Sequence, residues 1–498
     1  MPHGILLAID QGTTSTRCMS FDTLGRARRT MRRELTQIYP HDGWVEHDPE
    51  EIWRDTVETL RDVAEADGGD ILAIGITNQR ETVVVWDRET GVPIHNAIVW
   101  QDRRTAASCA GLKAQGCEAL VRARTGLLLD PYFSATKLRW LLDAVPGARA
   151  RAERGRLAFG TIDTFLLWRL TGGAVHATDA SNAARTLLYD IHKACWDPDL
   201  LALFAIPDSV LPEVRDNAAL FGATDKSLFG RPIPIGGMAG DQQAAMIGQA
   251  CFARGDAKAT YGTGCFLLLN TGNVAVPSRN GLITTIAYRI AGRTTYALEG
   301  SIFVAGAAVK WLRDGLGLIT HASDTNDLAT SLDDNHGVYM VPGFVGLGAP
   351  HWDPAARATI TGLTFDATGA HVARAALEAV AYQTLDLVDA MIADGAGEAR
   401  AIRIDGGMAA NDWFCQFLAD MLGTKVERPA DIETTAAGAA ILAGLTVGVW
   451  DRLEDVSTSW QGERLFEPRM DAATRARLET GWRDALSRSR STGIRSRA

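Results

Sequence analysis

The strongest constraint on the fold is a strand and turn pattern that occurs twice, about 250 residues apart. Both copies begin with an apolar run that ends in a turn of Gly and Thr, "DQGTT" in the first and "YGTGC" in the second. Short apolar runs separated by such turns predict strands. The predicted strands are 4–10, 15–21 and 27–36 in the first copy, and 257–261, 265–270 and 282–288 in the second. Helical segments follow in both copies.

The repeat indicates an internal duplication, because self-similarity at a fixed spacing is the signature of repeated units. A chain of 498 residues also suits two domains better than one core. We therefore expect an α/β protein with duplicated domains at residues 1–248 and 249–498. Two unrelated α/β domains remain the alternative at this point, since the two copies share little sequence identity.

Composition narrows the class of protein. The net charge of −10 argues against nucleic acid as a partner, because duplex binding requires a basic face. The basic last ten residues, 489–498, are expected to form a tail without a binding role. The apolar stretch 436–450 is too short to span a bilayer. Its many Gly and Ala residues predict a helix packed closely against a sheet.

The compartment is predicted from the cysteines and from the start of the chain. Seven cysteines are scattered without a C-x-x-C motif, which is typical of reduced thiols in a cytoplasmic enzyme. The opening "MPHGILLAIDQG" enters a strand directly and has no signal-peptide pattern. We expect a cytoplasmic protein with no membrane or nucleic-acid partner.

The first Gly/Thr turn predicts a phosphate site without lysine. Four consecutive hydroxyl residues, 13–16, follow Gly12, and backbone N–H groups of such a turn can bind an anion. Arg17 can supply a guanidinium fork, and Asp10 can organise Mg²⁺ through water. A plain β-hairpin explains this stretch equally well by itself. The second turn, at 262–264, favours the phosphate hypothesis.

A substrate site is predicted where the stretch "ITNQRETVVVWD" leaves a buried strand. Arg80 and Glu81 stand at the carboxyl end of that strand, where open α/β sheets bind ligands. The arginine can donate to a polyhydroxyl substrate and the glutamate can accept from it. A surface ion pair is the commoner use of such neighbours. Trp100 and Tyr132 could add an apolar wall and a hydroxyl group, although a lone Trp is more often a core residue.

Two further stretches carry candidate chemistry. In "GGMAGDQQAAMIG", Asp241 stands among small residues that favour desolvation, which raises the pKa of a carboxylate toward that of a useful base. From sequence alone, a helix N-cap is the favoured role for this residue. In "RIDGGMAAND", the Gly406–Gly407 pair and Asn411 suit an adenosine pocket.

These motifs together resemble the actin-like, ribonuclease-H-like ATPase superfamily, and within it the FGGY carbohydrate kinases. "IYPHDGWVEHDPEEIW", "NAIVWQDRRTA", "DPYFSATKL", "TYGTGCFLLLNTG" and "GLGAPHWDP" are similar to signatures of the FGGY kinases that phosphorylate glycerol. The resemblance covers residues 4 to about 480. It implies two ribonuclease-H-like domains flanking a cleft.

The resemblance also implies roles for individual residues. The glycerol-binding positions are Thr13, Arg80, Glu81, Trp100, Tyr132, Asp241, Gln242 and Phe266, with Asp241 as the general base. The nucleotide positions are Thr13, Thr14, Ser15, Arg17, Thr263, Gly306, Lys310, Gly407 and Asn411, and Asp10 is the metal-organising acid. Lys310 departs from the family, which often has Gln at this position.

The implied activity is transfer of phosphate from ATP to glycerol, giving ADP and sn-glycerol 3-phosphate, with Mg²⁺ as cofactor. A homodimer or homotetramer is expected by the same resemblance. Two alternatives remain at this point. One is an FGGY kinase acting on xylulose, ribulose or gluconate, and the other is an actin-like or chaperone-like ATPase that hydrolyses ATP without an acceptor.

Overall fold

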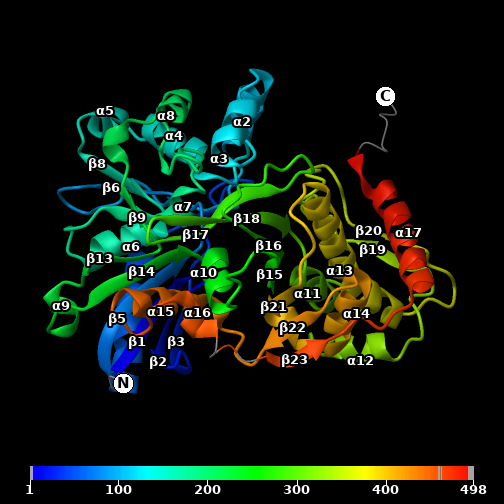
Figure 1. Cartoon of the computed structure of the whole chain (residues 1–498). Coiled ribbons are helices and arrows are strands. Elements are labelled where there is room, and N and C mark those ends of the chain that lie inside the picture. Colours follow the sequence, from blue (N-terminus) through cyan, green and yellow to red (C-terminus); the bar gives the residue numbers. More distant parts are fainter. Residues whose placement is uncertain (1–3, 458–459, 461, 492–498) are drawn as a thin grey trace.

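The computed structural model describes residues 4–457, 460 and 462–491, which form two α/β halves side by side (Figure 1). Each half is built on one large mixed sheet with helices packed against it. In order across the first sheet the strands are β13 (Ala218–Ala223), β14 (Pro234–Gly240), β5 (Asp70–Asn78), β1 (Gly4–Gln11), β2 (Ser15–Asp22) and β3 (Ala27–Glu34). Across the second sheet they are β17 (Ile283–Ile290), β18 (Arg293–Ile302), β16 (Cys265–Gly272), β15 (Asp256–Tyr261), β21 (Ala401–Asp405), β22 (Val426–Pro429) and β23 (Gly462–Phe466).

The two sheets share one topology, which confirms the predicted α/β class and its repeated design. In both, antiparallel pairings on one side, two in the first sheet and three in the second, are followed by two parallel pairings and a final antiparallel one. Strands β1 and β15 occupy the same place in their sheets, and each is followed by its Gly/Thr turn. The boundary predicted at residues 248 and 249 stays a prediction.

The second copy differs from the predicted strand order. The run at 282–288 becomes β17, but the strand beside β16 is β18, which the sequence reading did not include. β17 and β18 form a long hairpin, and β17 is the added edge strand of the second sheet. The prediction was wrong because "RTTYALEGSI" mixes polar and apolar residues, so it lacks the apolar run that marked the other strands.

The remaining elements connect and cover the sheets. Short strands are β4 (Glu46–His47), β6 (Val84–Asp87), β7 (Ala97–Ile98), β8 (Leu157–Gly160), β9 (Ala177–Asp179), β10 (Tyr189–Asp190), β11 (Cys195–Trp196), β12 (Glu213–Arg215), β19 (Tyr339–Val341) and β20 (Thr359–Thr361). Helices of the first half are α1 (Pro49–Asp67), α2 (Ala106–Ala114), α3 (Glu118–Thr125), α4 (Ser134–Ala144), α5 (Ala148–Glu153), α6 (Ile162–Leu170), α7 (Ala180–Ala183), α8 (Pro198–Phe204), η1 (Asp208–Val210), α9 (Lys226–Phe229) and α10 (Asp241–Gly248). Those of the second are α11 (Gly306–Asp314), α12 (Asp324–Thr330), α13 (Gly369–Ala393), η2 (Gly407–Ala410), α14 (Asp412–Leu422), α15 (Thr434–Thr446), α16 (Leu453–Ser457) and α17 (Ala472–Ser489).

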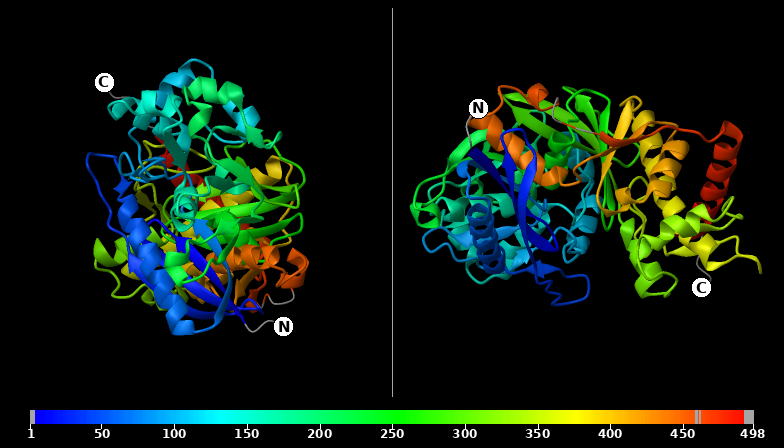
Figure 2. Two further views of the ribbon diagram at one scale, coloured as in Figure 1. Left: turned by 90° about the vertical axis from the view of Figure 1, so that its left-hand side faces the viewer. Right: turned by 90° about the horizontal axis from the view of Figure 1, so that it is seen from below.

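Helix α15 comes late in the chain but packs against the first sheet, on β1, β5 and β14 (Figures 1 and 2). Glycines on both sides allow the close approach. A Cβ added at Gly75 would lie 2.0 Å from the carbonyl oxygen of Ala439, and one at Gly438 would lie 1.9 Å from that of Ala244 in α10. The predicted close packing of this Gly- and Ala-rich helix is therefore confirmed. Because α15 lies on the first sheet, it brings a late part of the sequence into contact with β1, the first strand of the chain.

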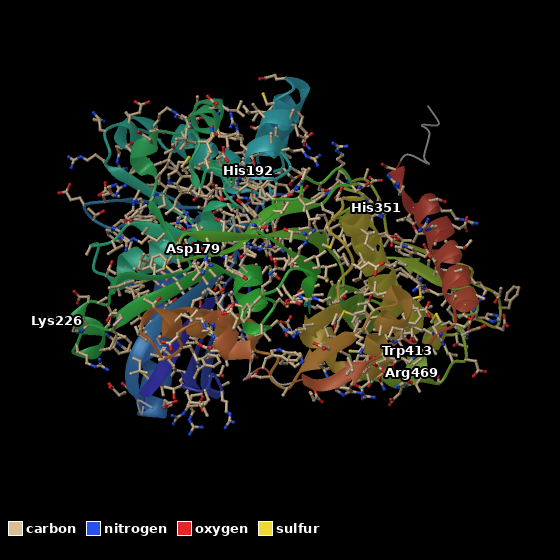
Figure 3. The ribbon with its side chains drawn as sticks, viewed as in Figure 1. Asp179, His192, Lys226, His351, Trp413 and Arg469 are labelled. Carbon is tan, nitrogen blue, oxygen red and sulfur yellow. The ribbon has the colours of Figure 1, made fainter. Side chains whose placement is uncertain are left out.

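A buried polar network supports the interior of the first half. Asp179 accepts hydrogen bonds from the backbone N–H groups of Ser181 (2.7 Å) and Asn182 (3.2 Å), and from Asn217 Nδ2 (2.8 Å). Asn182 and Asn78 in turn exchange side-chain hydrogen bonds of 3.0 and 3.1 Å. Asp179 lies well inside this half, whereas Lys226 lies at its outer edge (Figure 3). The network connects the carboxyl end of β5 to α7.

The C-terminal segment is only partly covered by the structure. α17 ends at Ser489, and the Ser491 hydroxyl donates to Asp353. The start of the predicted tail is therefore anchored, and its remaining residues, 492–498, lie outside the described residues. No helix within the described ranges has the length and apolar content needed to cross a membrane.

The contact between α15 and α10 gives a stability prediction. Gly438→Ala should destabilise the protein by about 1–3 kcal/mol, because the new Cβ overlaps the backbone of Ala244. Thermal unfolding measures the effect. Gly111→Ala in α2 is the control, since a Cβ there meets no atom within 4 Å. Equal unfolding temperatures for Gly438→Ala and the unsubstituted protein would contradict the close packing.

Candidate active site

Three predicted site residues meet at one edge of the first sheet. β1, β5 and β14 run parallel, with Gln11 opposite Asn78 and Asn78 opposite Gly240. The carboxyl ends of parallel strands lie at the same edge. Asp10, Arg80 and Asp241 are therefore brought together from segments far apart in sequence.

The loop after β5 is buried and held in a sparsely populated backbone conformation. Arg80 and Glu81 are 2% and 1% exposed, so the surface ion pair considered from sequence is excluded. Glu81 has a φ of 61°, which costs free energy for a residue with a Cβ. Such strain is retained where the surroundings fix it, often at functional sites.

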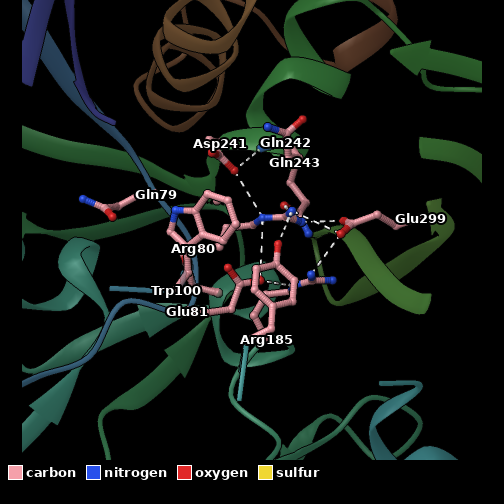
Figure 4. Close-up of polar contacts among 12 residues, drawn as sticks. Gln79, Arg80, Glu81, Trp100, Arg185, Asp241, Gln242, Gln243 and Glu299 are labelled. Atoms are coloured by element: carbon pink, nitrogen blue, oxygen red, sulfur yellow. Dashed lines mark hydrogen bonds and ion pairs between the residues drawn. The ribbon is translucent and has the colours of Figure 1, made fainter. Parts of the chain in front are cut away.

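Five buried or half-buried charges alternate in sign around this loop (Figure 4). Arg80 Nε lies 3.2 Å from Asp241 Oδ1, and both Nη atoms of Arg80 donate to Glu299. Arg185 donates to the same glutamate at 2.9 Å and to Glu81 at 2.6 Å. Burial would raise the pKa of Glu299, but Arg185 and Arg80 hold it at about 2. Glu299 is therefore an anion throughout the physiological pH range.

Asp241 has the environment expected of a base. It is the first residue of α10, and Gly240 is the N-cap, so the capping role favoured from sequence is wrong. Its Oδ1 accepts from the backbone N–H of Gln242 at 2.7 Å, and its side chain is 31% exposed. Burial raises the pKa of Asp241, while Arg80 and Lys258 oppose the rise. The carboxylate is thus accessible and is held by positive charges on one side.

The three aromatic residues proposed from sequence, Trp100, Tyr132 and Phe266, lie close to Arg80. Trp100 contacts Tyr132 and Phe266, with ring centroids 5.5 and 6.3 Å apart. The guanidinium of Arg80 lies 5.5 Å from the centroid of Phe266, and Tyr132 OH lies 3.4 Å from Arg80 Nη2. These rings form an apolar wall beside the charged groups. Such a wall suits the carbon backbone of a small polyol.

The first Gly/Thr turn lies next to this wall. Trp100 Nε1 donates to the Thr13 hydroxyl at 2.9 Å, and the turn is closed by a bond from Gly12 N to Ser15 O. Thr14 is exposed and Ser15 is half-buried. Arg17 forms ion pairs with Asp10 and with Glu433, which directly precedes α15. The guanidinium predicted to bind phosphate is thus held by two carboxylates that lie far apart in sequence.

The second half brings its own predicted residues together at the matching edge. β15 and β21 run parallel, and Thr260 lies opposite Asp405. The turn at 262–264 meets the start of α11, where Gly306 N donates to Gly262 O at 3.0 Å and Ala305 N donates to Thr263 O at 2.9 Å. Gly406 has a φ of 85° and touches the backbone of Tyr261, where a Cβ would lie 2.5 Å from the carbonyl oxygen.

The other nucleotide candidates differ in surroundings. Gly407 begins η2, and a Cβ there would meet no atom within 4 Å. Asn411 caps α14 by accepting from Phe414 N at 2.9 Å, and donates to Thr325 at 3.1 Å, so its side chain has structural partners. Lys310 is exposed on α11.

Three site residues were missed from sequence. Arg185 and Glu299 complete the charge cluster, and Lys258 in β15 donates to Gln242 and, at 3.0 Å, to Thr260. Glu299 and Lys258 are each a charged residue between two small or apolar neighbours in a strand, in Leu298–Gly300 and Ala257–Ala259, which is the signal that could have identified them. Burial lowers the pKa of Lys258, while Asp405 and Asp241 oppose that change.

The residues beside the first Gly/Thr turn fit a metal ion that is held mainly by bound phosphates and water, with few protein carboxylates. Among the residues that the structure describes, no three or more His, Cys, Asp or Glu side chains are grouped so that they could hold a metal ion. Asp10 is a carboxylate beside the phosphate turn. Mg²⁺ commonly binds with one or two carboxylates, water and substrate phosphates, and one carboxylate next to a phosphate turn is compatible with that mode.

Comparisons with known proteins agree with the two-domain fold described above and identify its family. Residues 5–248 match the N-terminal domain of the FGGY family of carbohydrate kinases, and residues 257–447 match its C-terminal domain. Glycerol kinase of Gluconobacter oxydans is 64% identical over 97% of this chain and 95% of its own, and that of Rhodospirillum centenum is 62% identical over 98% of both. The crystal structure of Plasmodium falciparum glycerol kinase with ADP superposes with a TM-score of 0.93 at 39% identity, covering 98% of each chain. The chain belongs to the FGGY family of carbohydrate kinases, within the group whose members are glycerol kinases.

Proposed function

We propose that this protein transfers the γ-phosphoryl group of ATP to a terminal hydroxyl of glycerol, with Asp241 as the general base. The observation that carries the proposal is the position of Asp241, an accessible carboxylate 3.2 Å from Arg80 Nε and beside the aromatic wall. The glycerol kinases to which the chain is 58–64% identical support the substrate.

Substrate binding follows from the charge cluster. Arg80 donates to glycerol oxygens, and Glu81 accepts a hydroxyl hydrogen on its second oxygen, since Arg185 occupies Oε1. Trp100 and Phe266 cover the carbon backbone. Gln242 and Tyr132 add polar contacts to the hydroxyl groups. The crowded rings favour a three-carbon polyol over a pentose.

In the proposed reaction, the hydroxyl oxygen attacks the γ-phosphorus while Asp241 takes the hydroxyl proton. The new O–P bond forms as the bond from the γ-phosphorus to the β,γ-bridging oxygen breaks, and ADP leaves with that oxygen. Burial raises the pKa of Asp241 toward that of a useful base, while Arg80 and Lys258 oppose the rise and so favour the ionised form that accepts the proton.

The two Gly/Thr turns suit the phosphates. Backbone N–H groups with the hydroxyls of Thr13, Thr14, Ser15 and Thr263 donate to phosphate oxygens, and Arg17 adds charge. Gly306, Gly407 and Asn411 face the nucleotide, and Lys310 lies at its rim. Asp10 would hold Mg²⁺, which neutralises phosphate charge during transfer.

A substrate comparison tests the proposed function. ADP release is measured with glycerol, xylulose, gluconate and no acceptor. We expect glycerol to stimulate release strongly and the two larger substrates to stimulate it weakly. Release that does not depend on any acceptor would instead support an actin-like ATPase.

Replacing the base tests its assignment. Asp241→Asn keeps the size of the side chain but removes its capacity to accept a proton, so kcat should fall by roughly 10²–10⁴-fold. The KM for glycerol should change little. Steady-state kinetics measure both, with Asp314→Asn on the exposed face of α11 as the control. Near-normal turnover by Asp241→Asn would refute the assignment.

Lys258 gives a pH prediction. Its ammonium stabilises the ionised form of Asp241, so Lys258→Met should raise the pKa of that carboxyl further. The acid limb of kcat/KM should then move to higher pH, by about one unit or less. Lys226→Met, at an exposed position on the outer edge of the first half (Figure 3), is the control. A limb that stays in place, or moves to lower pH, would contradict the coupling.

A further inference from the structure

Glu299 is a lone acidic residue within β18, a strand of the second sheet, and it is fully buried. Both of its oxygens accept hydrogen bonds from arginines that belong to the first half. Arg80 binds both oxygens, and Arg185 binds Oε1 at 2.9 Å (Figure 4). A buried carboxylate is unfavourable unless it is paired, and this one is paired twice.

We propose that Glu299 is a positioning residue for glycerol, which holds both substrate-binding groups of the loop after β5. It fixes the guanidinium of Arg80 directly. It also fixes Glu81 through Arg185, whose Nε donates to Glu81 Oε1 at 2.6 Å. The inference rests on the proposed function, because it assigns Arg80 and Glu81 to glycerol.

The contacts of Arg80 differ in strength, and this difference assigns their roles. The pairing with Glu299 is bidentate and ionic, which is the strongest geometry available to a guanidinium. The contacts to Tyr132 (3.4 Å) and Gln243 (3.3 Å) are long and therefore weak. A glycerol hydroxyl can replace these weak partners while Glu299 keeps the guanidinium in place.

Arg185 carries a further sign of a functional arrangement. Its Nη1 is buried and has no hydrogen-bond partner among the described residues. An unpaired buried donor is costly, and native proteins retain few of them. The other two nitrogens of Arg185 already donate to Glu81 and Glu299. The need to hold both glutamates therefore explains why Nη1 is left without a partner, which a role in packing alone would not.

The hairpin that carries Glu299 is itself fastened to the first half. Asn217 and the backbone of Arg289 in β17 exchange two hydrogen bonds of 2.8 Å. Tyr296 OH donates to Ile191 O at 2.9 Å, and Arg289 Nη1 donates to Tyr189 OH at 3.0 Å. These contacts fix β18 relative to the loop after β5, so Glu299 meets Arg80 in one defined place.

The test compares Glu299→Gln with the unsubstituted protein in steady-state kinetics. Gln keeps the size of the side chain but lacks the charge, so it cannot neutralise two arginines. We expect the KM for glycerol to rise about 10- to 100-fold, with kcat and the KM for ATP changed less than about threefold. Glu299→Asp keeps the charge and should give a smaller rise.

Glu427→Gln is the matched control, since Glu427 pairs with Arg403 at 3.0 Å in the same sheet, away from the site. It should leave every kinetic constant unchanged. A purely structural role for Glu299 would lower the unfolding temperature and kcat without raising the KM for glycerol. That result, or an unchanged KM, would overturn the inference.

A second variant covers the case in which Glu299→Gln does not fold. Arg185→Lys keeps a positive charge but loses the planar fork that reaches Glu81 and Glu299 together. It should raise the KM for glycerol in the same way, and an unchanged KM would overturn the inference. An unsubstituted protein without glycerol-dependent ADP release would refute the proposed function and this inference with it. An active one with an unchanged variant KM refutes the role of Glu299 alone.

Discussion

The structure depends on the neutralisation of buried charge between its two halves. Arg80 and Arg185 from the first half would be strongly destabilising in a water-poor interior without Glu81 and Glu299. Because Glu299 comes from the second sheet, the pairing is complete only when the two halves are assembled. The loop after β5 and the contact between the halves therefore depend on the same ion pairs.

Helix α15 makes the same connection by packing. Its backbone approaches the first sheet through glycines, and Glu433 at its start pairs with Arg17 of the phosphate turn. Helix α15 thus covers the sheet that contains the first strand, β1. The residue before the helix, Glu433, also pairs with Arg17 in the strand that follows the first Gly/Thr turn. The glycine contacts with the first sheet and the Glu433–Arg17 ion pair together fix the position of α15.

Local patterns predicted most of the fold and the part of the candidate site that lies on turns and strand ends, whereas Gln242 and Phe266 were added only by the family resemblance. The repeated strands, the two Gly/Thr turns and the Gly- and Ala-rich helix follow from short-range rules on burial and backbone freedom. Parallel strands then bring Asp10, Arg80 and Asp241 to one edge without further information. Arg185 and Glu299 could not be predicted in the same way, because their partners lie more than 100 residues away in sequence. The order of β17 and β18 was missed because β18 carries Glu299 and other polar residues in place of an apolar run.

The two halves place different residue types at the same edge of their sheets. At the first edge, Arg80 and Asp241 follow β5 and β14, and the rings of Trp100 and Phe266 pack against each other beside Arg80. At the second edge, glycines follow the strands, so backbone groups rather than side chains form the surface around Gly262 and Gly406. Under the proposed function, the charged groups of the first edge would discriminate between hydroxyl positions on glycerol, and the open backbone of the second would accommodate phosphates and a flat base. Because the edges are formed by corresponding parallel strands, the residue types that follow the strands are what distinguish the two edges.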